Sequence, residues 1–235
     1  MTKVVILCGG LGTRIGHETK YKPKPMVKIG QYPILEHIIN IYVKNGFKEF
    51  ILASGYKSQM IKNYFKKKKI KGTKIKTVFT GKNSLTGGRI KKLKKYFEKN
   101  EKFMVTYGDG LSNINIKKLL KFHEKHKKIA TMTVIHPPAR FGEAILNKND
   151  FLVKFEEKPQ VNQGWINGGF FVFNYEIFNF IKHEYIMLEK EPIKSLVKRK
   201  QIKVFKHHGF WKCMDTLRDK IQLNTMLKKN KAPWL

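Results

Sequence analysis

Apolar and polar residues follow one another along the chain in blocks, and their spacing changes between that of strands and that of helices. Residues 4–8 form an uninterrupted apolar run that ends at two glycines, which is typical of a strand buried on both faces of a sheet. Apolar side chains between 34 and 43 recur instead at helical spacing. Repetition of these patterns predicts strands at 4–8, 50–53, 74–79, 103–106 and 129–135, and helices at 34–43, 60–65, 87–97 and 119–122.

This alternation predicts the α/β fold class. Strands joined by helices form a mostly parallel sheet with helices on both faces, so we expect a single Rossmann-like domain over residues 1–235. Ligands of such sheets bind beyond the carboxyl ends of the strands. The second half is richer in strands and makes the expected sheet a mixed one. Its patterns predict strands at 143–146, 152–156 and 166–174, a helix near 175–181, further short strands and a last helix at 217–228.

Composition restricts the class of protein further. Hydrophobic residues make up 41% of the 235 residues, which excludes general disorder. No apolar run approaches the roughly 20 residues of a membrane-spanning helix, and the apolar stretch near the N-terminus is too short for a signal peptide. The two cysteines offer neither a disulfide framework nor a zinc site. We therefore expect a cytoplasmic protein without membrane insertion.

The net charge is unusually high. Lys and Arg number 49 against 17 Asp and Glu, which gives +32 and favours anionic partners at low salt. A nucleic-acid-binding protein and a solvated lysine surface are the two interpretations. The lysines are spread from Lys3 to Lys231, and the densest run, 66–69, lacks interleaved aromatic residues that could stack on bases. The sequence favours the solvated surface, so we expect no specific nucleic-acid partner.

Two segments carry candidate phosphate-binding chemistry. The glycines of residues 9–14 let backbone N–H groups approach a polyphosphate, and Thr13 and Arg14 add a hydroxyl and a guanidinium. A tight turn with an exposed arginine explains the glycines equally well. Downstream, Lys22 and Lys24 each precede a proline, which holds them on a stiff, extended segment suited to phosphate binding. A proline-rich surface loop would explain that segment alone.

Together, residues 9–14 and 22–26 resemble the signature of the sugar-phosphate nucleotidylyltransferase family. The resemblance covers nearly the whole chain, because further motifs follow in the family's order at 84–89, 106–110, 138–142, 155–159, 166–171, 209–211, 214–219 and 231–234. Two features depart from the family pattern. Cys8 stands where the family usually has alanine, and the lysine-rich connection between Phe65 and Ile75 is shorter. The second departure concerns subunit contacts more than chemistry.

The resemblance implies the nucleotide-diphospho-sugar transferase fold, with a nucleotide-binding half at 1–135 and a sugar-phosphate-binding half at 136–235. It implies a Mg²⁺-dependent reaction in which a sugar 1-phosphate oxygen attacks the α-phosphorus of a nucleoside triphosphate and pyrophosphate leaves. No general base is needed, because the attacking phosphate is already ionised, so the protein must position anions and neutralise charge.

Within the family, the motifs most resemble those of members that use CTP and glucose 1-phosphate to make CDP-glucose for cell-surface polysaccharide. The resemblance also implies a homo-oligomer. The alternative is the same chemistry with UTP, dTTP or another hexose 1-phosphate.

The resemblance further implies roles for individual residues. Lys24, Arg14 and Asp109 would be catalytic, and Asp109 and Asp215 would hold the metal. Without the resemblance, Asp109 is explained by a turn at a strand end, which is common. For Asp215 alone, a role as the N-cap of the last helix is the stronger explanation. Lys158, Asn167 and Gly168 would hold the sugar phosphate.

The expected nucleotide site combines the glycine segment with a second loop. Gly87 and Gly88 are expected at a helix N-terminus, where backbone N–H groups favour anions. The histidines show no spacing that predicts a metal site. The residues expected to bind the nucleotide are Leu7, Gly9, Gly10, Leu11, Gly12, Thr13, Arg14, Lys24, Ser84, Arg89 and Gly108.

Overall fold

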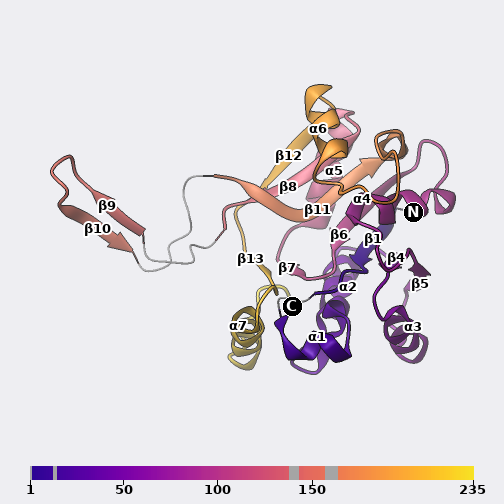
Figure 1. Ribbon diagram of the computed structural model, residues 1–235, viewed down its shortest axis with the longest axis horizontal. Helices are drawn as coiled ribbons and strands as arrows, with labels where there is room; N and C mark the ends of the chain where they lie inside the picture. The colour runs from indigo at the N-terminus through magenta and orange to yellow at the C-terminus, as the bar shows by residue number, and fades with distance from the viewer. Residues whose placement is uncertain (1, 13–14, 138–142, 157–163) are drawn as a thin grey trace.

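A computed structural model describes residues 2–12, 15–137, 143–156 and 164–235 (Figure 1). Its central sheet has 7 strands in the order β12-β8-β11-β6-β1-β4-β5. Only β11 runs antiparallel to its neighbours, β6 and β8, and the other pairs are parallel. The strands of this sheet are β1 (Lys3–Cys8), β4 (Glu49–Ser54), β5 (Lys74–Phe79), β6 (Lys102–Tyr107), β8 (Ala130–Ile135), β11 (Ile166–Asn174) and β12 (Ile202–His207). The predicted α/β fold with a mostly parallel, mixed sheet is confirmed.

Helices cover both faces of the sheet, and the alternation of side chains along β1 explains why. Val4 and Ile6 point into one hydrophobic core, whereas Val5 and Leu7 point into the other. The first core is covered by α2 (Ile34–Lys44), α3 (Ser58–Lys67), α5 (Ile116–His126) and α7 (Leu217–Lys228), and the second by α4 (Thr86–Lys92), the 3₁₀ helix η4 (Tyr175–Asn179) and α6 (Glu191–Lys198).

One short strand pair closes the carboxyl end of the sheet. Strand β7 (Gly110–Ser112) leaves the end of β6 and pairs antiparallel with β13 (Trp211–Cys213). The Met214 amide then donates to the Asp109 carbonyl oxygen over 2.8 Å. This pairing brings the two predicted metal-binding segments together although they lie far apart in sequence.

Several elements differ from the prediction. The helix expected at 87–97 ends at Lys92 and is followed by the 3₁₀ helix η3 (Lys94–Tyr96), and the helix expected at 175–181 is the 3₁₀ helix η4. Lys24 does not lie on an extended segment, because it begins the 3₁₀ helix η2 (Lys24–Met26). The elements that were not predicted are α1 (His17–Tyr21), the pair β2 (Lys28–Ile29) and β3 (Tyr32–Pro33), β7 and α6.

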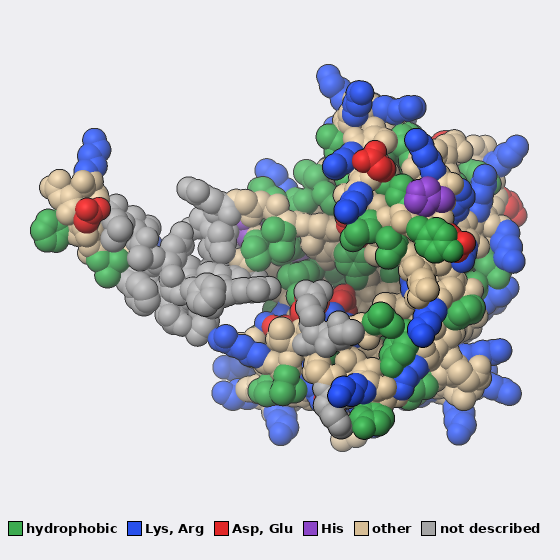
Figure 2. Space-filling view, viewed as in Figure 1, with side chains coloured by type: hydrophobic (Ala, Val, Ile, Leu, Met, Phe, Trp, Pro, Cys, Tyr) green, Lys and Arg blue, Asp and Glu red, His purple; other side chains and the backbone are tan. Residues whose placement is uncertain are grey.

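The two remaining strands form a separate hairpin. Strands β9 (Glu143–Leu146) and β10 (Leu152–Glu156) pair antiparallel with each other, at the predicted positions, and project from the main body in Figure 1. Lysine and arginine side chains stand around the whole outline of the main body in Figure 2 rather than gathered in one stripe. Within the described part of the chain, no helix is both long and apolar enough to cross a membrane.

Candidate active site

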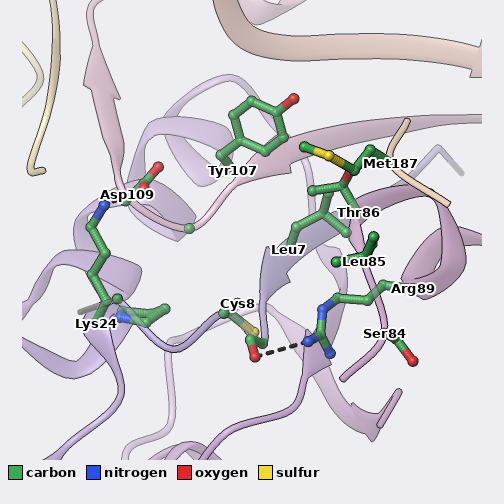
Figure 3. Close-up of a pocket in the computed structure, with 15 residues that line it drawn as sticks. Leu7, Cys8, Lys24, Ser84, Leu85, Thr86, Arg89, Tyr107, Asp109 and Met187 are labelled. Atoms are coloured by element: carbon green, nitrogen blue, oxygen red, sulfur yellow. Dashed lines mark hydrogen bonds and ion pairs between the residues drawn. The ribbon is translucent and has the colours of Figure 1, made fainter. Parts of the chain in front are cut away.

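Two cavities meet at the carboxyl end of the parallel strands. The first has a volume of about 320 Å³ and the second about 230 Å³. Tyr107 and Asp109, at the end of β6, belong to the walls of both. The first cavity is lined by Leu7, Cys8, Gly9, Gly10, Gly12, Lys24, Pro25, Ser84, Leu85, Thr86, Arg89, Tyr107, Gly108, Asp109 and Met187 (Figure 3).

The glycine segment after β1 forms one wall of the first cavity. A Cβ on Gly9 would lie 2.2 Å from the Arg89 guanidinium, and a Cβ on Gly12, whose φ is +66°, would lie 2.5 Å from Lys24. Both glycines therefore admit a cationic side chain from another segment. Leu11 is 49% exposed and does not line the cavity, and Thr13 and Arg14 lie outside the described residues.

Arg89 forms the floor of the first cavity and is 4% exposed. Its guanidinium donates to the carbonyl oxygens of Gly9 at 2.9 Å and Gly81 at 2.8 Å, and to Thr80 Oγ1 at 2.8 Å. Burial lowers the pKa of Arg89, but an arginine stays protonated in proteins. Because these acceptors are neutral oxygens, a positive charge remains beside the glycine segment. Ser84 is buried next to it and donates to the Thr80 carbonyl oxygen over 2.6 Å.

The first turn of α4 packs against a segment from the second half of the chain. A Cβ on Gly88 would lie 1.7 Å from the Glu184 carbonyl oxygen, so this glycine admits the segment 184–188 rather than a phosphate. The Leu85 and Gly88 amides donate to the carbonyl oxygens of Glu184 and Ile186 at 3.3 and 3.2 Å. Two of the N–H groups near the start of the helix are thereby satisfied within the protein, and anion binding by the others stays a prediction.

Lys24, Asp109 and Asp215 form a charged cluster between the cavities. Lys24 Nζ lies 2.6 Å from Asp109 Oδ2 and 2.5 Å from Asp215 Oδ1. Burial lowers the pKa of Lys24, but the charges and hydrogen bonds of the two carboxylates outweigh it, and the pKa lies above its ordinary value. Lys24 therefore bridges the carboxylates as an ammonium ion. Figure 3 shows its side chain extending toward Asp109 on the opposite side of the cavity from Arg89.

This cluster has the chemistry of a divalent-metal site with two protein ligands. The Lys24 ammonium is a cation seated between two carboxylates, the position that a metal ion would take. Among the described residues, no group of three or more His, Cys, Asp or Glu side chains could hold a metal. A metal bound here would need further oxygen ligands, as Mg²⁺ finds in phosphates and water.

The alternative explanation of Asp215 as a helix cap is wrong. Thr216 is the N-cap of α7, and its side chain accepts from the Asp219 amide over 3.2 Å. Asp219 completes the capping box by accepting from the Thr216 amide over 2.9 Å. Asp215 stands one position earlier, where its side chain is available to Lys24. Asp109 likewise points its carboxylate at Lys24.

The second cavity lies on the other side of Asp109. Asn167 and Gly168, both expected to hold the sugar phosphate, line it together, and Trp211 Nε1 donates to the Gly168 carbonyl oxygen over 2.7 Å. Lys158, the third residue expected here, lies outside the described residues. The full lining is Thr106, Tyr107, Asp109, Gly110, Asn167, Gly168, Gly169, Phe170, Trp211, Cys213 and Asp215.

The sequence interpretation missed several residues of these walls. Tyr107 and Trp211 occur in motifs that were recognised at 106–110 and 209–211, so their positions in those motifs were the available signal. Thr86 likewise lies inside the recognised segment 84–89, whereas Met187 belongs to no recognised motif. Cys8 and Cys213 are free thiols whose pKa values burial raises to about 12, so both are protonated at neutral pH.

Comparison with known proteins identifies the family. Residues 3–225 match the family model described as nucleotidyl transferase, a family whose enzymes generally depend on a divalent metal. The glucose-1-phosphate cytidylyltransferase of Salmonella typhimurium is 41% identical, over 99% of this chain and 98% of its own. A D-glycero-α-D-manno-heptose 1-phosphate guanylyltransferase of Campylobacter jejuni is 40% identical over 75% of this chain and 78% of its own.

Solved structures agree on the fold. The crystal structure of HddC from Yersinia pseudotuberculosis, complexed with GMP-PN, has a TM-score of 0.75 and 24% identity, covering 97% of this chain and all of that chain. A UDP-glucose pyrophosphorylase complexed with UDP-glucose has a TM-score of 0.77 at 16% identity and covers 98% of this chain and 99% of its own. The family model, the full-length relatives and the fold agree, and the chain belongs to the nucleotidyl transferase family.

Proposed function

We propose that this protein transfers the cytidylyl group of CTP to α-D-glucose 1-phosphate, which gives CDP-glucose and pyrophosphate, with Mg²⁺ as the cofactor. The supporting observation is the pair of cavities that meet at Asp109, with a bridging lysine beside them. Two adjoining cavities suit two anionic reactants that must meet at one phosphorus atom. Choice of CTP and glucose 1-phosphate rests on the full-length relative from Salmonella typhimurium.

The proposed roles follow the positions of the residues. The first cavity would hold the nucleotide, with Leu7, Gly9, Gly10, Gly12 and Gly108 close to its phosphates and the Arg89 charge beneath the glycine segment. The second cavity would hold the sugar phosphate beside Asn167 and Gly168. We also assign the remaining predicted residues to these substrates: Leu11, Thr13, Arg14 and Ser84 to the nucleotide and Lys158 to the sugar phosphate.

The bond-forming step is an in-line displacement at phosphorus. A phosphate oxygen of glucose 1-phosphate forms a bond to the α-phosphorus of CTP as the bond to the pyrophosphate oxygen breaks. Mg²⁺ bound by Asp109 and Asp215 would neutralise phosphate charge. Lys24, released from the carboxylates, and Arg14 would stabilise the negative charge on the transferring group. No proton has to be removed from the attacking group.

The product would serve nucleotide-sugar and cell-surface polysaccharide synthesis, including lipopolysaccharide O-antigen. We place this work in the cytoplasm, where CTP and sugar phosphates are produced. The enzyme is further proposed to act as a homo-oligomer, which sedimentation analysis at working concentration would test.

A substrate panel tests the proposed function. Pyrophosphate release should be measured with CTP, UTP, dTTP, GTP and ATP, each against glucose 1-phosphate, mannose 1-phosphate and a heptose 1-phosphate. We expect the highest kcat/KM for CTP with glucose 1-phosphate. A higher value for UTP or dTTP would establish the alternative substrate choice on the same chemistry. Absence of pyrophosphate release with every pair would refute nucleotidyl transfer to these sugars.

A further inference from the structure

A chain of hydrogen bonds joins the walls of the two cavities through Glu189, which lies in the loop before α6. Glu189 Oε2 accepts from Thr86 Oγ1 over 2.6 Å, and Oε1 accepts from the Tyr107 hydroxyl. The Tyr107 oxygen in turn accepts from Asn167 Nδ2 over 3.1 Å. Thr86 belongs to the first cavity, Asn167 to the second, and Tyr107 to both. Glu189 itself lines neither.

The carboxylate sets the direction of every bond in this chain. An ionised Glu only accepts, so both hydroxyls must turn their hydrogens toward it. The Tyr107 oxygen is then left with lone pairs for the Asn167 amide N–H. At its other end, Asn167 Oδ1 accepts from the Gly169 amide over 2.8 Å. The two fixed partners, an acceptor on one side and a donor on the other, allow one orientation of the Asn167 amide.

The backbone around Asn167 is held equally firmly. The pairing of β11 with β8 is irregular between Asn167 and Phe171, and Gly169 has φ of +77°. A Cβ on Gly169 would lie 2.6 Å from the Tyr107 ring, so the ring packs directly on this bulge. Tyr107 therefore contacts Asn167 through its hydroxyl and Gly169 through its ring.

We propose that Glu189 is a positioning residue that, through the Tyr107 hydroxyl, orients the Asn167 amide for the sugar phosphate in the second cavity. This inference rests on the proposed function and adds a residue that no recognised motif contains. With Glu189 in place, one amide N–H and one oxygen lone pair of Asn167 remain for sugar hydroxyls. Without its carboxylate, the tyrosine hydrogen can turn toward Asn167 and displace the amide from this orientation.

Glu189→Gln tests the proposal, because glutamine keeps the size of the side chain but brings a donor that must face one of the two hydroxyls. We expect KM for the sugar phosphate to rise about tenfold, as for one lost hydrogen bond, while KM for the nucleotide changes less than twofold. Tyr107→Phe keeps the ring on Gly169 and should give the same rise. The double variant should be no worse than either single variant, because the two groups act in series.

The matched control is Glu191→Gln, which makes the same charge change at an exposed position two residues away. It should leave both KM values unchanged. A lowered melting temperature with unchanged KM values would mean a merely structural role and overturn the inference. Equal rises in both KM values, or additive effects in the double variant, would also overturn it. If instead the wild-type protein is inactive with the whole substrate panel, the proposed function fails and this role falls with it.

Discussion

Replacing Lys24 by methionine should separate its two tasks, bridging the carboxylates and assisting transfer. The Lys24 side chain is 10% exposed, and those of Asp109 and Asp215 are 29% and 20% exposed. Removing one partner of a fully buried ion pair costs about 3–5 kcal/mol, and the partial exposure here reduces the expected loss to about 2 kcal/mol. For a chain of this size, the melting temperature should fall by about 4–8 °C in metal-free buffer.

The same change should strengthen metal binding while it removes activity. In the wild-type protein a divalent ion must displace the Lys24 ammonium, whose hydrogen bonds to charged groups contribute about 1.5–3 kcal/mol each. Lys24→Met removes this competition, so we expect Mn²⁺ to bind the nucleotide-free protein at least about tenfold more tightly. Turnover at saturating substrates should fall on the order of 100-fold, by analogy with the loss of one donor to transition-state charge.

Calorimetric Mn²⁺ titration, thermal unfolding and pyrophosphate release together check this prediction. Lys28→Met is the matched control, because Lys28 is an exposed lysine four positions away that lines neither cavity. The control should bind Mn²⁺ and turn over like the wild-type protein. Unchanged or weaker Mn²⁺ binding by Lys24→Met would refute the competition between ammonium and metal. Near wild-type turnover would refute the role of Lys24 in transfer.

Three further predictions concern the metal ligands, pH and salt. Asp109→Asn and Asp215→Asn should each nearly abolish turnover and the double variant should be hardly worse, whereas multiplicative losses would show that the carboxylates do not share one metal. Burial lowers the pKa of His37, which bonds the Ile29 carbonyl oxygen through Nε2 and accepts from Trp234 Nε1 at Nδ1. The contribution of neutral His37 to stability is therefore complete above the unfolded pKa of about 6.5 and is lost as pH falls through the lower folded pKa. The free energy of unfolding, measured by urea titration, should fall more between pH 7 and pH 5 for the wild-type protein than for His37→Gln. Turnover should persist at about 150 mM salt while DNA binding vanishes, and a salt-resistant, sequence-selective DNA complex would contradict a merely solvated lysine surface.

The inner strands of the main sheet could be predicted because they are buried apolar runs with clear limits. Residues 103–106 lie inside the buried strand β6, and residues 166–174 form a strand over the predicted range. Short elements such as β2 and β3 escaped prediction because two residues carry no periodicity. Helix α6 was missed because only a few of its side chains are buried, including Pro192 and Leu196.

Residues of the candidate site could be predicted where one short motif contains them. Contacts between segments far apart in the sequence could not. Asp109 and Asp215 lie on either side of Lys24 Nζ, close enough together for the shared site that the family resemblance implied, whereas their ion pairs with Lys24 were not predicted. Gly88 was assigned to anion binding, whereas its missing side chain makes room for Glu184, almost a hundred positions away. Glu189 had no signal at all, since its role depends on which hydroxyls the fold brings to it.

The outer strands of the central sheet have a consequence for self-association. Strands β5 and β12 stand at its two ends, and each carries outward lysines, Lys74 and Lys76 on the first and Lys203 and Lys206 on the second. An edge strand has unpaired backbone N–H and C=O groups that can pair with a strand of another chain. Charged lysines on the edge oppose this pairing, because the lysines of two copies repel each other. Part of the chain's excess of positive charge thus acts as protection against aggregation. This protection weakens as salt screens the repulsion between copies.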